Sequence, residues 1–190
     1  MKDVQIERGV AKVAAGTWLV GRGQPLAYGG APLRLTSLRG FFVADRQKVQ
    51  VVTAQGEIYC GAGERPFLTR LDCPVEVQAV SEKVLVAPPE ARVGAVLMRL
   101  IPMSFRLAMS VTRFAQRWVV MATRSRVIQV SLAEGETLTV RREAVVAWTT
   151  RRPTGFCPKL RLRDVFLPRV RPTGLMMTFY GPGLLWLEGA

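Results

Sequence analysis

The chain has 190 residues, the size of one compact domain, and 49% hydrophobic with 22% charged residues exclude global disorder. Histidine is absent, which excludes His-based triads, histidine metal ligands and histidine acid–base chemistry. The 27 Lys and Arg against 14 Asp and Glu give a net charge of +13, which attracts phosphate-bearing partners. Arginine outnumbers lysine by 22 to 5, a bias that suits phosphate recognition but also follows from a high-GC genome.

The first half of the chain is typical of short strands separated by glycine-rich turns. Val75, Val77 and Ala79 alternate with polar residues, which is the period of a half-buried strand. Short strands with turn signals at this spacing predict a sandwich or barrel. We therefore expect residues 1–90 to form a first β unit.

The middle segment, residues 91–117, combines apolar residues with spaced arginines. These arginines are the candidate membrane or partner face: Arg92, Arg99, Arg106, Arg113 and Arg117. The first four recur every seven residues, which keeps them on one face of a helix but on opposite faces of a strand. A basic helix lying on an anionic membrane is one interpretation, and a core-packing linker helix with a solvated arginine stripe is the simpler one. A strand is the third alternative, because apolar residues from Met103 to Val111 alternate with smaller or polar ones.

Short strands resume at Trp118 and predict a second β unit over residues 118–190, which together with the first forms one compact domain. A basic segment within it holds the candidate anion-binding residues: Arg151, Arg152, Lys159, Arg161, Arg163, Arg169 and Arg171. Over residues 159–163 three cations alternate with two leucines, so a strand there would expose all three cations on one face. That face would bind phosphates through guanidinium groups, or would be a solvated edge strand protected by its charge.

Little in the sequence supports catalysis or a cofactor. The pair Gly21 and Gly23 belongs to a turn and lacks the G-K-[ST] of a phosphate loop, so we expect no enzyme activity, no cofactor and no metal. Three cysteines without a C-x-x-C spacing favour a reducing compartment. No run reaches the ~18 apolar residues of a spanning helix, so we expect a cytoplasmic protein that is soluble or peripheral to a membrane.

Two stretches of the second half carry a family resemblance. One is the hairpin Leu132-Ala133-Glu134-Gly135-Glu136-Thr137-Leu138-Thr139-Val140 with the apolar run 144–148, and the other is the ending Tyr180-Gly181-Pro182-Gly183-Leu184-Leu185-Trp186-Leu187-Glu188. Both resemble motifs of the altered inheritance of mitochondria protein 24 family. The resemblance implies a fold like the tryptophan RNA-binding attenuation protein, two pseudo-equivalent β units and homo-oligomers. Mitochondrial members are associated with inner-membrane organisation, and the family carries no established catalytic residues to transfer. The basic balance of this chain and its arginine-studded middle depart from the family.

The sequence thus predicts an all-β protein, a β-sandwich of two similar units, with a short helix as one alternative for the middle segment. Its predicted role is a non-enzymatic, homo-oligomeric scaffold or binding protein, peripheral to an anionic membrane. A nucleic-acid binding module that uses the Arg-rich second half is the alternative.

Overall fold

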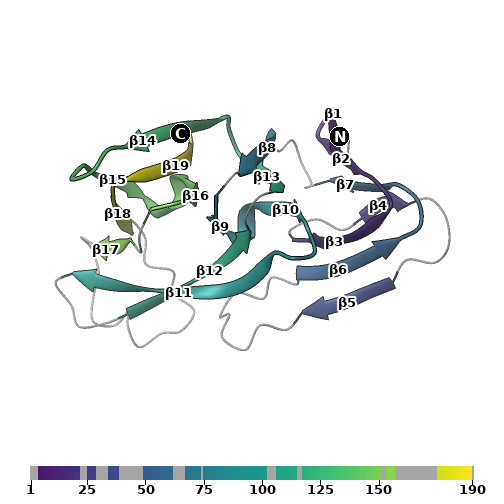
Figure 1. Ribbon diagram of the computed structural model, residues 1–190, viewed down its shortest axis with the longest axis horizontal. Helices are drawn as coiled ribbons and strands as arrows, with labels where there is room; N and C mark the ends of the chain where they lie inside the picture. The colour runs from purple at the N-terminus through teal and green to yellow at the C-terminus, as the bar shows by residue number, and fades with distance from the viewer. Residues whose placement is uncertain are drawn as a thin grey trace.

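A computed structural model describes residues 4–21, 25–28, 34–38, 49–61, 67–73, 75–101, 106–114, 117–150, 153–156 and 175–189 (Figure 1). The strands up to the middle of the chain are β1 (Val4–Glu7), β2 (Val10–Val13), β3 (Gly16–Val20), β4 (Pro25–Tyr28), β5 (Arg34–Leu38), β6 (Val49–Ala54), β7 (Ile58–Gly61), β8 (Phe67–Cys73), β9 (Val77–Val80) and β10 (Val84–Ala87). They are followed by β11 (Arg92–Ile101), β12 (Arg106–Phe114), β13 (Arg117–Thr123), β14 (Val127–Leu132), β15 (Thr137–Arg141), β16 (Val145–Trp148), β17 (Thr154–Phe156), β18 (Met176–Tyr180) and β19 (Gly183–Glu188).

The described residues outside the strands include two single-turn 3-10 helices, η1 (Ser81–Lys83) and η2 (Arg142–Ala144). The prediction of an all-β protein is confirmed. Among the described residues, no helix is long and apolar enough to cross a membrane.

Two sandwiches make up the molecule, and their main sheets share one strand order. The main sheet of the first sandwich has the strand order β5-β6-β3-β10-β13-β8. The main sheet of the second has the order β11-β12-β9-β16-β19-β14, in which β14 is the edge strand and β11 is joined to further strands. In both sheets a 3-10 turn precedes the fourth strand in this order, and the register shifts where that strand pairs with the fifth. The same arrangement of strands therefore occurs twice in one chain.

Each main sheet is covered by a second layer. Strands β1-β2-β7-β4 cover the first sheet. In the second sandwich the order continues past β11 through the parallel neighbour β17 to β18 and β15. This extension folds back over the main sheet, because the rings of Trp148 on β16 and Phe179 on β18 lie 5.6 Å apart.

Apolar side chains fill three cores. One lies within the first sandwich around Trp18 and Trp118, whose ring centroids are 5.1 Å apart, and one lies within the second around Trp148. The third joins residues of both main sheets, including Leu19 of β3 and Ala147 of β16, and so packs the sandwiches against each other.

The unit boundaries predicted at residues 90 and 118 do not coincide with a division between the sheets. Strand β9 precedes residue 90 but pairs with β12 and β16 of the second sandwich. Strand β13 lies almost wholly beyond residue 118 but pairs with β10 and β8 of the first. The two sandwiches exchange strands along the chain, and sequence composition carries no sign of this exchange.

Of the alternatives for the middle segment, the strand is confirmed and the helix is wrong. Residues 92–101 and 106–114 are strands β11 and β12 of an antiparallel hairpin. Val96 and Met98 of β11 are buried at alternate positions, so the period of two decides the structure and the seven-residue spacing of the arginines does not. In a strand that spacing puts Arg92 and Arg99 on opposite faces, so no single arginine stripe forms.

Candidate anion-binding site

The β11–β12 hairpin brings the arginines of the middle segment together in pairs. Arg92 lies directly opposite Arg113, and Arg99 lies directly opposite Arg106. Residues opposite each other in antiparallel strands share a face and have Cβ atoms about 5 Å apart, and like charges there are destabilising. The pairs are separated by seven residues, or ~23 Å along the strand. Arg92 and Arg113 therefore place two positive charges on one face of the hairpin, and Arg99 places a positive charge on the other.

Arg92 and Arg99 are exposed, and Arg113 is half-buried. Over the part of the chain that the structure describes, no carboxylate lies within ion-pair distance of any of these three. Some of the other described cations do have such partners, for example Arg70 with Asp72 at 2.8 Å, whereas the exposed Arg126 and Arg141 have none among the described residues. The hairpin charge is thus available to an external anion.

Arg113 also belongs to a row of side chains that crosses four strands. In register, Arg92 on β11 is opposite Arg113 on β12, Arg113 is opposite Gln78 on β9, and Gln78 is opposite Trp148 on β16. All four lie on the face that also carries Val80, Val96 and Val111, which belong to the core of the second sandwich. We call these four residues the polar row.

The polar row contains three buried polar atoms without a hydrogen-bond partner in the described residues. They are Nε of Arg113, Oε1 of Gln78 and Nε1 of Trp148, each with less than 1 Å² exposed. Buried polar atoms in folded proteins are nearly always hydrogen-bonded to protein, water or a ligand. Three on adjacent strands mark the polar row as a place for a polar binding partner.

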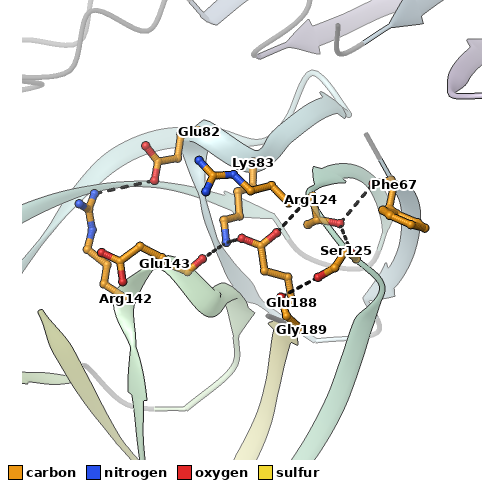
Figure 2. A network of polar contacts seen from close by, with 10 residues as sticks. Phe67, Glu82, Lys83, Arg124, Ser125, Arg142, Glu143, Glu188 and Gly189 are labelled. Carbon is orange, nitrogen blue, oxygen red and sulfur yellow. Dashed lines mark hydrogen bonds and ion pairs between the residues drawn. The ribbon is translucent and has the colours of Figure 1, made fainter. Parts of the chain in front are cut away.

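A second polar cluster lies where the two sandwiches meet (Figure 2). Lys83 of η1 donates from Nζ to Oε1 of Glu188 at 2.6 Å and to the backbone carbonyl of Glu143 in η2. The other carboxylate oxygen of Glu188 accepts from the backbone N–H of Arg124 at 2.9 Å. One ion pair thereby joins both 3-10 turns, the last strand and the loop after β13.

This ion pair is nearly enclosed, since the side chains of Lys83 and Glu188 are 9% and 10% exposed. Burial lowers the pKa of Lys83, and the hydrogen bond and charge of Glu188 oppose that shift. Because both charges are satisfied within the protein, this cluster is a structural joint and leaves no charge for a ligand.

The predicted site residues are divided among the part of the chain outside the described residues, the hairpin and strand β13. All seven candidate anion-binding residues lie outside the described residues: Arg151, Arg152, Lys159, Arg161, Arg163, Arg169 and Arg171. Four of the five residues of the predicted membrane or partner face lie on the hairpin: Arg92, Arg99, Arg106 and Arg113. Arg117 lies on β13 of the first sandwich, opposite Cys73, and so does not belong to the hairpin.

Gln78 and Trp148 were not predicted as site residues. They lie far from the arginines in sequence, and Trp148 is expected in a core from its apolar neighbours. Strand register alone places Gln78 opposite Arg113 and Trp148 opposite Gln78. Among the described residues, no group of three His, Cys, Asp or Glu side chains is placed to hold a metal ion.

Comparisons with known proteins give the fold but not the role. No protein-family model matches the sequence, and no curated protein matches it. The X-ray structure of protein SPYM3_0169 from Streptococcus pyogenes is similar, with a TM-score of 0.70 and 10% sequence identity. The match covers 98% of this chain and 92% of the Streptococcus chain. At this identity the likeness shows a shared fold.

Proposed function

We propose that the protein is a non-enzymatic, homo-oligomeric binding scaffold that docks on an anionic membrane. The observation that carries the proposal is the arginine pairing on the β11–β12 hairpin, where Arg92 and Arg99 are exposed and like charges face each other across the strands. Each arginine near an anionic lipid surface contributes about 1 kcal/mol to binding. An anionic partner would also relieve the repulsion within each pair.

Self-association is supported by the edge of the second main sheet. Strand β14 is the last in its order, and its sequence Val-Ile-Gln-Val-Ser-Leu contains no charge and no proline. Ile128, the second residue of β14, is 55% exposed. The corresponding edge of the first sheet, β8, carries the exposed Arg70 and Asp72 instead. Proteins protect edge strands with charge, so the unprotected β14 favours pairing with a second copy.

Co-sedimentation with vesicles tests the proposed docking. Purified protein is mixed with neutral and with anionic vesicles at physiological salt, with a nucleic-acid competitor in parallel. Selective pelleting with anionic vesicles that survives the competitor is the expected result. Absence of pelleting, or its loss to nucleic acid, contradicts membrane docking; the second outcome favours a nucleic-acid binding module that uses the same arginines. Salt weakens both kinds of binding and does not separate them.

A further inference from the structure

We propose that the polar row is a binding site for a phosphate-type oxyanion, either free phosphate or the phosphate of a headgroup. This inference goes beyond the proposed function, because it rests on buried atoms of Arg113, Gln78 and Trp148 and shares only Arg92 with the exposed charge that vesicle docking needs. It starts from the three buried polar atoms of Arg113, Gln78 and Trp148, which occupy one register row on neighbouring strands.

The charge of the row selects an anion over a neutral molecule. Arg92 and Arg113 face each other across β11 and β12, and no carboxylate of the described residues pairs with either. Water would accept hydrogen bonds from the buried N–H groups but would leave the repulsion between the two positive charges without a counter-ion. An anion satisfies the donors and neutralises the pair, and charge-assisted hydrogen bonds of this kind are stronger than neutral ones.

The donors of the row select a tetrahedral oxyanion over a carboxylate. The donors of Arg92 and Arg113 lie on the neighbouring strands β11 and β12, about 4.8 Å apart, whereas Trp148 on β16 lies ~10 Å from Arg113 across β9. A carboxylate has two oxygens in one plane and suits a single guanidinium, whereas phosphate presents oxygens in several directions. The amide of Gln78 lies between Arg113 and Trp148, and its NH₂ group is the part that can donate to an oxyanion, because its Oε1 is an acceptor.

Titration of the full-length protein with sodium phosphate, against sodium chloride at matched ionic strength, tests the site. We expect saturable heat release in calorimetry and a Tm that rises with the logarithm of the phosphate concentration. The variant Arg113→Met keeps the buried stem and removes the donors, and should weaken phosphate binding about tenfold or more. Arg126→Gln removes an exposed arginine elsewhere in the second sandwich and should bind phosphate like the wild type.

The near-isosteric variant Gln78→Glu gives a second, independent readout. Its carboxylate would supply an internal anion beside Arg113, so the variant should have a higher Tm than the wild type without phosphate and no response to phosphate. The proposal is overturned if the wild type shows no saturable effect beyond chloride, or if Gln78→Glu binds phosphate as tightly as the wild type. These results stand even if Arg113→Met fails to fold.

A parallel arm distinguishes the two sources of phosphate. Protein bound to phosphatidic acid vesicles is challenged with free phosphate at constant ionic strength. Release by free phosphate identifies the headgroup as a ligand of the row, and retention together with saturable phosphate binding identifies free phosphate as its ligand. If the wild type binds free phosphate but does not bind the vesicles, the docking proposal is contradicted and the proposal of a phosphate site at the polar row is not.

Discussion

Lys83 and Glu188 form an ion pair at 2.6 Å in the joint between the sandwiches, and each is about one-tenth exposed. Removing one partner of such a pair leaves the other charge buried and typically costs 3–5 kcal/mol, whereas replacing both by apolar residues costs far less. We expect Glu188→Leu to lose about 3–5 kcal/mol of unfolding free energy in urea titrations and Lys83→Met/Glu188→Leu to recover most of that loss. The exposed pair Lys12 and Glu57 is the control, since its double replacement should leave the urea midpoint unchanged. Equal losses in the single and double variants at the joint would contradict this account.

Cys60 shows the effect of burial on a single thiol. It is 0% exposed within the core of the first sandwich, and burial raises its pKa to about 12. We expect the thiol of Cys60 not to react with a thiol reagent at pH 8 until the protein unfolds, because the reactive species is the thiolate. The folded pKa lies above the ordinary value of 9.0, so this thiol lowers stability as the pH rises from 9 to about 12 and has no such effect below pH 9. Rapid labelling of Cys60 in the native state at pH 8 would contradict its enclosure.

At the scale of elements, β14 accounts for the expected self-association. Ile128→Lys places a charge on its exposed surface, which is how natural edge strands avoid pairing. Light scattering coupled to size-exclusion chromatography should show a smaller assembly than the wild type, with an unchanged Tm for the dissociated protein. Phe67→Lys, at an exposed position on the edge strand β8, is the matched control and should leave the mass unchanged. A monomeric wild type, or a loss of mass in both variants, would contradict pairing through β14.

The β11–β12 hairpin shows how far sequence reasoning extends for one element. Its alternation of buried residues such as Val96 and Met98 is readable from the sequence, yet the arginines at seven-residue intervals favour a helix with equal ease. The competition is decided by pairing with β9, which lies outside the segment. Once the hairpin forms, its register converts evenly spaced arginines into two facing pairs, Arg92 with Arg113 and Arg99 with Arg106.

For the whole molecule, the all-β class follows from short strands and glycine turns, but the arrangement of the sheets does not. The order β11-β12-β9-β16-β19-β14 mirrors that of the first main sheet because strands far apart in sequence pair with each other. The polar row depends on the same long-range pairing: Gln78, Arg113 and Trp148 come from three separate segments, and no local spacing joins them. The arginines of the site were therefore predictable from charge, whereas Gln78, Trp148 and the assembly of the row were not.

The hairpin arginines are proposed to dock the protein on an anionic surface. The most direct test compares two variants of equal charge, Arg92→Gln/Arg99→Gln on the hairpin and Arg126→Gln/Arg141→Gln at exposed positions elsewhere in the second sandwich. Arg92 and Arg99 lie on opposite faces of the hairpin, so only one of them meets a flat membrane. At about 1 kcal/mol for that arginine, the hairpin variant should lose about fivefold in partitioning to anionic vesicles. The other variant should bind nearly as well as the wild type. Equal loss in both variants would mean that net charge alone drives binding, and would contradict a docking role for the hairpin.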